Sequence, residues 1–415
     1  MPKTFVEKLM SQKAGKEVSA GAMVSIRPDY VMSHDNAAAI ANTFKKIGVS
    51  NVKYPEGVVI ILDHEVPAPK ESSAVNHKEI REFVEEQGIA NFYDVNHGIC
   101  HQVFVEQGFA MPGKFIVGSD SHTTTYGALG AFAAGIGRSE VAAIWATGEL
   151  WFQVPETMKI IIKGTIPRHI TPKDMVLYII GQIKSDGADY KSVEFTGETV
   201  SYMDIGERMV LTNMAAEMGA KNGYIPPDPV TFDFIRGRAK AEFEPLYSDE
   251  DAAYYQTFEF DISKISPSVA KPHTVDNYAP IEEVEGTKIH QALIGTCTNG
   301  GLRDLEGAAE ILNGKKVKAR TLIIPASWEI YKEALKKGYI ETFIDAGAMV
   351  LNPGCGPCLG AHQGVMAPGE VTFSTANRNF KGRMGCREAE IYLGSPLSVA
   401  ASAVTGEITH PGRFL

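Results

Sequence analysis

The chain of 415 residues is longer than one hydrophobic core usually serves, so we expect two or three domains. Its 44% hydrophobic and 22% charged residues allow a large core and exclude a disordered protein. The net charge of −10 argues against a general binder of nucleic acids or membrane surfaces, so neither is an expected partner.

The N-terminal residues lack the apolar core and the small-residue cleavage site of a secretory signal. Thr4–Gln12 instead has the spacing of a short amphipathic helix that buries Phe5, Leu9 and Met10. No stretch approaches the roughly 18 uninterrupted apolar residues of a membrane span. Five scattered cysteines do not make a disulfide scaffold, which favours the reducing cytoplasm as the location.

Short apolar runs alternate with helical periodicity along nearly the whole chain. The runs that predict strands are Val58–Leu62, Phe115–Gly118, Lys159–Lys163, Gln291–Gly295, Thr321–Ile324 and Ala348–Leu351. The periodic segments that predict helices are Asn36–Ile47, Lys78–Gln87, Met175–Ile183, Ile205–Met218, Leu302–Leu312 and Trp328–Lys337. Because the Val- and Ile-rich runs are continuous, both faces of the strands should be covered, which predicts an α/β protein with largely parallel sheets.

Composition divides the chain into three expected α/β domains, at residues 1–155, 156–284 and 285–415. The clearest boundary is Ser263–Gly286, where three prolines and little periodicity indicate a linker. Small residues recur at close intervals in Thr125–Gly137. Since no Walker pattern is present, this segment predicts a glycine-rich helix that packs tightly rather than a phosphate loop.

In the first domain, acidic residues stand beside histidines directly after two predicted strands. The motifs are Asp63–His64 and Asp120–Ser121–His122, with His101 between them in the chain. The carboxyl ends of parallel strands are where α/β proteins bind ligands. A carboxylate raises the pKa of a neighbouring imidazole and fixes its orientation, as a general acid requires. Histidines with satisfied hydrogen bonds remain the alternative for each position, but the repeated motif favours function.

Asn213 and Glu217 lie four residues apart in the predicted helix Ile205–Met218 and therefore share one helix face. An exposed helix often shows this spacing by chance. The pair alone predicts no site.

Three cysteines follow predicted strands in the last third of the chain. Cys355 and Cys358 form a Cys-x-x-Cys motif in a Gly/Pro loop, which alone fits zinc or a redox disulfide as well as an iron–sulfur cluster. Cys297 adds a third cysteine in a polar turn. Three such residues without an equally placed fourth indicate a 4Fe–4S cluster with one open iron, a Lewis acid for a hydroxyl and a carboxylate. We expect Cys100 and Cys386 to pack as small apolar residues or to lie near the site, with Cys386 in reserve as a ligand.

A basic loop lies near the C-terminus of this acidic chain. Arg378, Lys381, Arg383 and Arg387 fall within ten residues. Guanidinium groups are the usual bidentate clamps for carboxylates, which favours a substrate-binding loop. A solvated basic loop is the alternative, and the loop alone slightly favours it.

Nine ordered segments together resemble the aconitase superfamily, and most closely the large subunits of two-subunit isopropylmalate dehydratases and their homoaconitase relatives. The segments are LDHEVPAP, GICHQ, VGSDSHTTTYGALGAFAAGIG, LTNMAAEMGA, VAKPHTVDN, IGTCTNG, NPGCGPCLGAHQG, STANRNFKGRMG and YLGSPLSVAASAVTGEITHP. They run over nearly the whole chain, so chance similarity is negligible. The resemblance implies three α/β domains packed around a central 4Fe–4S cluster.

Carried over residue by residue, the resemblance implies a role for each matching side chain around the cluster. Cys297, Cys355 and Cys358 match the cluster ligands. Asn213 and Asn377 match residues that lie beside the cluster.

The resemblance also implies which residues act on the substrate. The catalytic set is Asp63, His64, His101, Asp120, His122 and Glu217. The first two match the pair associated with protonating the departing hydroxyl, and the others match residues around the iron-bound oxygen. Ser121, Arg378 and Arg383 match residues that bind substrate carboxylates. His34 stands in the early substrate-binding segment, where single-chain aconitases carry a glutamine, and is a further substrate-binding candidate.

Nothing in this sequence matches the family's fourth domain, which supplies a proton-abstracting serine and another carboxylate-binding arginine. The resemblance therefore implies a separate small subunit that carries this domain, and a nearly silent isolated chain. The first expected reaction is the interconversion of 3-isopropylmalate and 2-isopropylmalate in leucine biosynthesis. Homoaconitate, 2,3-dimethylmalate and maleate or citraconate are alternative substrates, and a zinc-binding or redox Cys-x-x-Cys protein is the non-enzymatic alternative.

Overall fold

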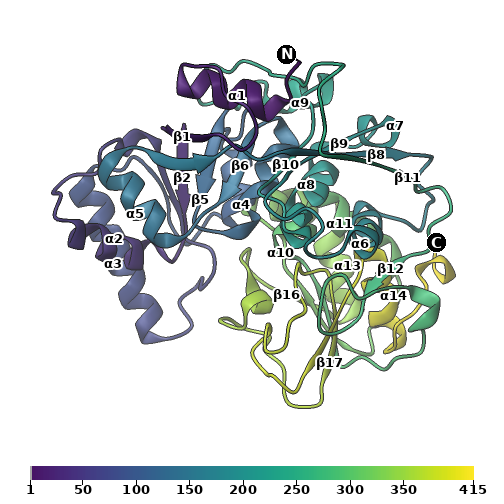
Figure 1. Ribbon diagram of the computed structural model, residues 1–415. Coiled ribbons are helices and arrows are strands. Elements are labelled where there is room, and N and C mark those ends of the chain that lie inside the picture. The colour runs from purple at the N-terminus through teal and green to yellow at the C-terminus, as the bar shows by residue number, and fades with distance from the viewer. Residues whose placement is uncertain (1) are drawn as a thin grey trace.

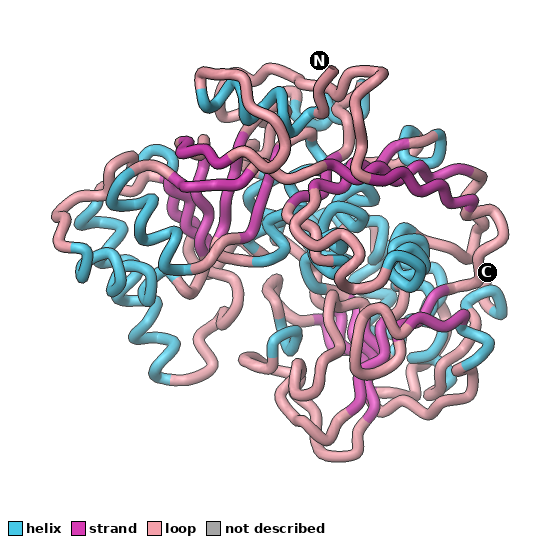
Figure 2. The backbone as a smooth tube through the Cα atoms, viewed as in Figure 1, coloured by secondary structure: helices cyan, strands magenta, loops and turns pink. Residues whose placement is uncertain are grey.

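The computed structural model describes residues 2–415 as a mixed α/β structure whose strands gather in separate sheets (Figure 1; Figure 2). Three of the sheets have four or more strands and are wholly or largely parallel, so the α/β fold class predicted from the sequence is confirmed. Over residues 2–415 no helix is both long enough and apolar enough to cross a membrane.

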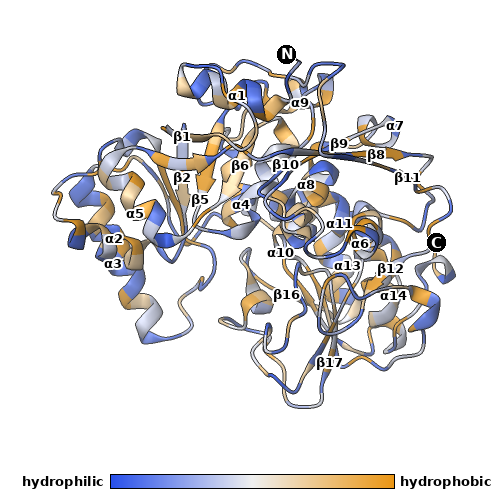
Figure 3. Ribbon diagram, in the orientation of Figure 1, coloured by the Kyte–Doolittle hydropathy of each residue, from blue (hydrophilic) through white to orange (hydrophobic). Residues whose placement is uncertain are grey.

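The first sheet has five parallel strands in the order β4-β3-β2-β5-β6. The strands are β2 (Tyr30–Ser33), β3 (Val58–Ile61), β4 (Asn91–Tyr93), β5 (Phe115–Gly118) and β6 (Phe132–Gly135). The helices that pack with them are α1 (Phe5–Ala14), α2 (Ala37–Ile47), α3 (Glu71–Gln87), α4 (Cys100–Glu106) and α5 (Arg138–Thr147). Val58 and Ile60 join the core that contains α2, α3 and α5, whereas Val59 and Ile61 join the core that contains α4. Both faces of the sheet are therefore buried, as its apolar strands require (orange in Figure 3).

The second sheet has four parallel strands in the order β10-β9-β8-β11. The strands are β8 (Thr157–Lys163), β9 (Ser192–Thr196), β10 (Asn222–Tyr224) and β11 (Gln256–Asp261). The helical elements of this part are α6 (Pro172–Ile183), α7 (Glu198–Ser201), α8 (Ile205–Met214), η3 (Ala215–Met218) and α9 (Pro229–Ile235). A separate antiparallel ribbon pairs β1 (Met23–Ile26) with β7 (Leu150–Gln153).

The third sheet has seven strands in the order β13-β12-β18-β17-β14-β15-β16. The strands are β12 (Ser268–Ala270), β13 (Tyr278–Pro280), β14 (Gln291–Ile294), β15 (Arg320–Ile323), β16 (Met349–Val350), β17 (Val371–Ser374) and β18 (Glu390–Leu393). The helices of this part are α10 (Thr296–Asn299), α11 (Leu302–Leu312), α12 (Trp328–Lys336), α13 (Tyr339–Ala346) and α14 (Pro396–Thr405). Besides η3, the 3-10 helices of the described chain are η1 (Pro55–Gly57), η2 (Ser121–Leu129), η4 (Ile281–Glu283), η5 (Gly356–Leu359) and η6 (Pro411–Arg413).

Most of the predicted elements form where the sequence placed them. The strand Phe115–Gly118 and the helix Leu302–Leu312 begin and end as predicted. The N-terminal helix buries Phe5, Leu9 and Met10 and begins with a capping box between Thr4 and Glu7. The domain boundaries stay a prediction.

Two predictions about local structure are wrong. The expected linker Ser263–Gly286 contains β12 and β13, which pair antiparallel with each other, while β12 also pairs with β18. Its prolines do not prevent this, since Pro280 ends an edge strand where no ladder donor is needed. Thr125–Gly137 is not one helix but the end of the 3-10 turn η2 followed by β6. Its tight packing is real: a Cβ on Gly127 would lie 1.5 Å from the carbonyl oxygen of Gly223.

Candidate functional site

Most of the predicted site residues follow strands of the first and third sheets, whereas Asn213 and Glu217 lie in α8 and η3. In the first sheet the chain proceeds from β2 to one side through β3 and β4, and to the other side through β5 and β6, so the order reverses between β2 and β5. In the third sheet the order reverses between β14 and β17. Such switch points leave a crevice at the carboxyl edge, where open α/β sheets bind ligands.

Asp63 and His64 follow β3 and form a buried acid–imidazole pair. Asp63 is fully buried, and its Oδ1 lies 2.5 Å from Nδ1 of His64. Its Oδ2 accepts a 2.7 Å bond from the backbone N–H of Cys100 at the start of α4. Burial lowers the pKa of His64, but the neighbouring charges of Asp63 and Cys355 outweigh burial and hold the pKa well above its usual value. The pair therefore has the geometry of an oriented proton donor.

Asp35, which the sequence reading missed, fixes the turn that carries this pair. Its carboxylate accepts backbone N–H bonds from Asp63, His64 and Glu65, at 2.8, 2.8 and 3.2 Å. His77 of α3 completes the set at 2.8 Å. Burial raises the pKa of Asp35, but the bond from His77 and the neighbouring imidazole charges outweigh it and lower the pKa overall. The turn is thus held by a second carboxylate behind it.

His34 lies against His64 with ring centroids 4.0 Å apart, and its buried Nδ1 has no hydrogen-bond partner within residues 2–415. Burial lowers the pKa of His34 to about 4, so its ring is neutral near pH 7. His34, Asp35, Asp63 and His64 offer ligand atoms within 4.8 Å of one another, as a metal site would. Both carboxylates already accept two or more hydrogen bonds, so we assign the group as a hydrogen-bonded network.

A chain of charged groups links the loop after β5 to the second and third sheets. Asp120 lies 2.9 Å from Nε2 of His101 and accepts the backbone N–H of His122 at 2.7 Å. Nε2 of His122 lies 2.7 Å from Glu217, and Nε of Arg378 donates to the same carboxylate at 2.8 and 3.0 Å. The structure therefore brings together five of the predicted residues in one continuous network.

The pKa values of the two carboxyls follow from this network. Burial opposes ionisation of Asp120, but bonds from His101 and His122 outweigh it and hold its pKa well below the usual 3.8. Burial likewise opposes ionisation of Glu217, and the bonds and charges of His122 and Arg378 hold its pKa below the usual 4.5. Both groups are therefore carboxylates at neutral pH.

The sulfur of Cys297 lies between two side-chain amides. Nδ2 of Asn213 lies 3.3 Å from this sulfur, and Nδ2 of Asn377 lies 3.5 Å from it. Asn377 also donates to Oδ1 of Asn213, and Thr125 accepts a 2.8 Å bond from Asn213. Burial raises the pKa of the Cys297 thiol to about 12. Amide donors aimed at a cysteine sulfur are the arrangement that stabilises a metal-bound thiolate.

Cys355 and Cys358 lie in the loop after β16 and are both buried. The sulfur of Cys355 lies 3.8 Å from Oδ2 of Asp63, and its backbone N–H donates to the carbonyl of Asp63 at 3.2 Å. Nη2 of Arg383 lies 3.8 Å from the sulfur of Cys358. Gly356 has φ +55° and a Cβ there would lie 2.3 Å from Ile324, so the loop needs glycine at this position. The Cys-x-x-Cys loop thus packs directly against the acid–imidazole pair.

The donor set of this region fits an iron–sulfur cluster. Each of the three thiols lies against a polar group of the site: Cys297 against the amides of Asn213 and Asn377, Cys355 against Asp63, and Cys358 against the guanidinium of Arg383. Nε of Arg383 is buried without a hydrogen-bond partner in the described part of the chain. A cluster with anionic ligands in the pocket offers such groups acceptors that the protein itself does not supply.

The side chains of Cys100, Cys386 and Ser121 form none of the contacts described above. Cys100 is fully buried and its backbone bonds Asp63, so it lies beside the site. Cys386 lies 3.2 Å from the carboxylate of Glu388. Ser121 is exposed at the start of η2, next to Asp120.

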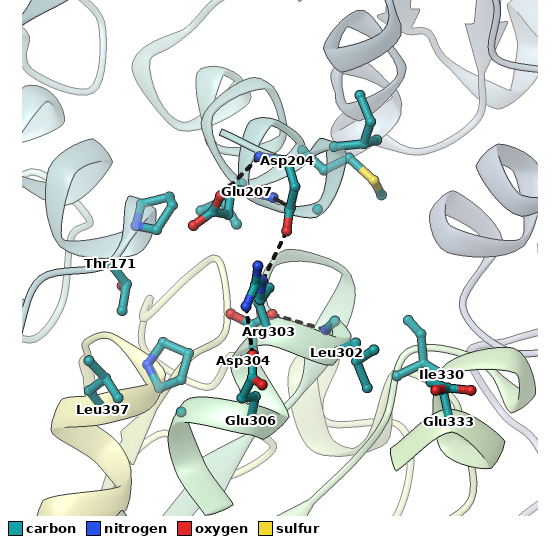
Figure 4. A pocket seen from close by; sticks show the side chains of 18 of the residues that line it. Thr171, Asp204, Glu207, Leu302, Arg303, Asp304, Glu306, Ile330, Glu333 and Leu397 are labelled. Carbon is teal, nitrogen blue, oxygen red and sulfur yellow. Dashed lines mark hydrogen bonds and ion pairs between the residues drawn. The ribbon is translucent and has the colours of Figure 1, made fainter. Parts of the chain in front are cut away.

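A cavity of about 1100 Å³ lies elsewhere, lined by none of the predicted site residues. It is bordered by the first turns of α6, α8, α11 and α14 (Figure 4). Its acidic side chains are engaged: Asp204 and Glu207 cap α8, and Arg303 bonds Asp204 and Glu306 at 3.2 and 2.8 Å. These side chains are therefore already paired within the chain.

Sequence reasoning missed several residues of the site. Tyr126 lies 3.1 Å from Nδ1 of His101, and Lys173 donates to the backbone just before Asn377. Among these residues only Asp35 could have been predicted from the sequence, because it follows β2 as Asp63 follows β3. His77 and Lys173 lie inside helices, where a polar residue gives no sign of the face it occupies.

Comparison with known proteins assigns the family. Residues 7–406 match the model of the aconitase family (aconitate hydratase). A probable methanogen homoaconitase large subunit of Methanosarcina mazei is 55% identical over 387 residues, which cover 93% of this chain and 99% of that protein. A probable 3-isopropylmalate dehydratase large subunit of Methanothermobacter thermautotrophicus is 51% identical over the full length of both chains. The crystal structure of Thermococcus kodakaraensis aconitase X, 15% identical, matches with a TM-score of 0.54 over 90% of this chain and 89% of that one, which supports the fold alone. The chain belongs to the aconitase family.

Proposed function

We propose that this chain is the large, cluster-bearing subunit of a hydro-lyase that dehydrates and rehydrates a small hydroxy di- or tricarboxylate. The observation that carries the proposal is the contact between the cysteine loop and the acid–imidazole pair, where Cys355 lies 3.8 Å from Asp63. The full-length relatives named as dehydratase and homoaconitase large subunits support the same reaction class.

Cys297, Cys355 and Cys358 would hold a 4Fe–4S cluster. When bound, the cluster supplies a Lewis-acidic iron that polarises the C–O bond of the substrate, because hydroxide is a poor leaving group. Asn213 and Asn377 offer hydrogen bonds to the sulfur of Cys297 and so stabilise it as a thiolate.

The chain's own side chains handle the proton and the carboxylates. Because Nδ1 of His64 is bonded to Asp63, Nε2 is the nitrogen left to give a proton to the departing hydroxyl. His101, Asp120, His122 and Glu217 form a hydrogen-bonded network on one side of the site. This network would orient the hydroxyl or water oxygen that leaves and rejoins the substrate.

The substrate carboxylates would bind beside these residues. Arg378 keeps Nη donors beyond the Nε that bonds Glu217, and Arg383 approaches Cys358, so both guanidinium groups face the same region. Ser121 adds a hydroxyl, and neutral His34 contributes a ring nitrogen beside His64.

A small subunit would supply the serine that removes the carbon-bound proton and a further carboxylate-binding arginine. The names of the full-length relatives, which call them large subunits, support such a partner. Five free cysteines support a cytoplasmic location, because thiols stay reduced there.

We propose 3-isopropylmalate as the substrate, with interconversion to 2-isopropylmalate in leucine biosynthesis. Homoaconitate is the second candidate, because the relative at 55% identity is named a homoaconitase. In Methanothermobacter thermautotrophicus, relatives of both names are 51% and 49% identical to this chain, so identity does not choose between them.

The test is an anaerobic assay of the cluster-loaded chain with its small subunit on 2- and 3-isopropylmalate and on homoaconitate. We expect turnover of 3-isopropylmalate by the pair and almost none by the chain alone. Turnover of homoaconitate instead would select the second candidate. Full activity of the chain alone, or inactivity of the cluster-loaded pair on every small hydroxy acid tried, would refute the proposal.

A further inference from the structure

Lys173 lies at the first turn of α6 and is completely buried. A buried ammonium loses its hydration, so it persists only where hydrogen bonds and nearby negative charge replace the water. The surroundings of Lys173 therefore indicate what holds it there.

The ammonium of Lys173 donates to the backbone of one loop. Nζ donates to the carbonyl oxygens of Thr375 and Ala376 at 3.0 and 2.8 Å, and lies 3.7 Å from the sulfur of Met214. Within residues 2–415, no carboxylate forms a hydrogen bond or ion pair with it. Its donors are thus used, but its charge is not paired by direct contact.

Both segments that Lys173 touches lead to the sulfur of Cys297. Ala376 precedes Asn377, and Met214 follows Asn213, and these two amides are the ones that approach that sulfur. Arg378 follows Asn377 and bonds Glu217. The ammonium therefore lies directly behind the loop that presents an amide to the cysteine and a guanidinium to the network.

The groups that raise the pKa of Lys173 are residues of the site and one helix cap. Burial lowers its pKa to about 8, while Cys297, Glu217, Asp304 and Cys358 act in the opposite direction. Two of these four are cysteines of the site. The lysine is therefore mostly protonated at pH 7, behind the segments that carry Asn213 and Asn377.

We propose that Lys173 is a positioning residue and internal counter-cation of the cysteine site, which holds the Thr375–Ala376 backbone and offsets the negative charge of the bound cluster. This inference rests on the proposed function. A positive charge near the cluster favours its reduced, more negative state, so its removal should make reduction harder.

The experiment measures the cluster reduction potential by anaerobic redox titration in the full chain, and KM and kcat in the complex with the small subunit. Lys173→Met removes charge and donors with little change in volume, whereas Lys173→Gln removes the charge but keeps an amide donor. Lys221→Met is the matched control, because Lys221 is a part-buried lysine that also donates to a backbone carbonyl, that of Gly135, and the charge that acts on its pKa is Glu140 rather than a cysteine.

We expect both Lys173 variants to shift the potential to more negative values, and Lys221→Met to leave it unchanged. Lys173→Met should also raise KM about tenfold more than Lys173→Gln, since only Met releases the loop that carries Arg378. Iron-loaded Lys173 variants with wild-type potential would overturn the inference and leave the proposed function standing. Wild-type chain that binds no iron would overturn both.

Discussion

The site has two halves that handle buried polar groups in different ways. The acid–imidazole half consists of Asp35, Asp63, Asp120 and Glu217 with their histidines, and each carboxylate is bonded by an imidazole and by N–H groups from the backbone or an arginine. The cysteine half consists of Cys297, Cys355 and Cys358 with the amides and guanidinium groups beside them. There amide and guanidinium donors approach the sulfurs of Cys297 and Cys358, burial raises the pKa of the Cys297 thiol, and Nε of Arg383 has no partner in the described part of the chain.

The difference indicates which half the chain completes by itself. The acid–imidazole half forms its hydrogen bonds without a ligand and should keep its geometry in the metal-free protein. The cysteine half gains acceptors and opposite charge only when a metal group binds. Substitutions in the two halves should therefore separate loss of chemistry from loss of the cluster.

The largest effect is expected in the cysteine half. Cys355→Ser removes one of the three proposed thiolate ligands, so it should abolish both the cluster absorbance and the activity, with the secondary structure kept. Iron content, visible absorption and circular dichroism would measure this. Cys386→Ser is the control, because Cys386 contacts Glu388, and it should load iron as the wild type does. Equal loss in both variants would break the distinction between the halves.

Asp63→Asn tests the acid–imidazole half. The variant keeps the shape of the side chain but removes the carboxylate that orients His64, so kcat should fall by about 10²–10⁴-fold, the usual range for general acid catalysis. Iron content should stay near the wild-type level. If the variant loses its cluster as completely as Cys355→Ser, the two halves do not act separately.

Arg378→Lys should have a smaller effect on activity than Asp63→Asn. Lysine keeps the charge but loses the planar donor set that bonds Glu217 and would bind a carboxylate, so kcat/KM should fall by about 10–100-fold. The control is Arg320→Lys, which changes a bidentate pair with Glu370 at the surface. If Arg378→Lys keeps the wild-type kinetics, Arg378 does not bind the substrate.

The smallest expected effect concerns stability and pH. The pKa of Asp120 is lowered in the folded chain, so its contribution to the free energy of unfolding is complete above its ordinary value of 3.8 and is lost as the pH falls below it. Asp120→Asn should cost about 1–3 kcal/mol at pH 7 and unfold with a weaker pH dependence in that acidic range. Denaturant titrations of the metal-free protein from pH 2 to pH 7 measure both; parallel curves for variant and wild type would contradict the assignment.

Local patterns in the sequence predicted the elements that depend on local burial. The run Phe115–Gly118 is fully buried and ends at a glycine, so its strand was recognisable. The strands in Ser263–Gly286 depend instead on pairing with β18, more than a hundred residues later in the chain. The segment Thr125–Gly137 depends on the close approach of Gly223. Such contacts leave no periodic pattern in the segment itself.

The same limit applies to the site. An acid beside a histidine after a strand predicted the carboxyl edge, and the structure places Asp63 and Asp120 there. Lys173 and Asp174 follow Thr171 and Pro172 as an ordinary helix start, and a charge in that position is usually solvated. Burial of this lysine depends on the distant loop at Thr375, which no local pattern of the chain shows.

The central claim is that Cys297, Cys355 and Cys358 together hold a cluster with one iron free of cysteine. Iron and sulfide analysis with Mössbauer spectroscopy of the full chain, prepared without oxygen, tests it most directly. We expect about four iron and four sulfide per chain, with one iron signal that shifts when the hydroxy-acid substrate is added. Zinc in place of iron, or four iron signals of which none shifts when the substrate is added, would contradict the claim.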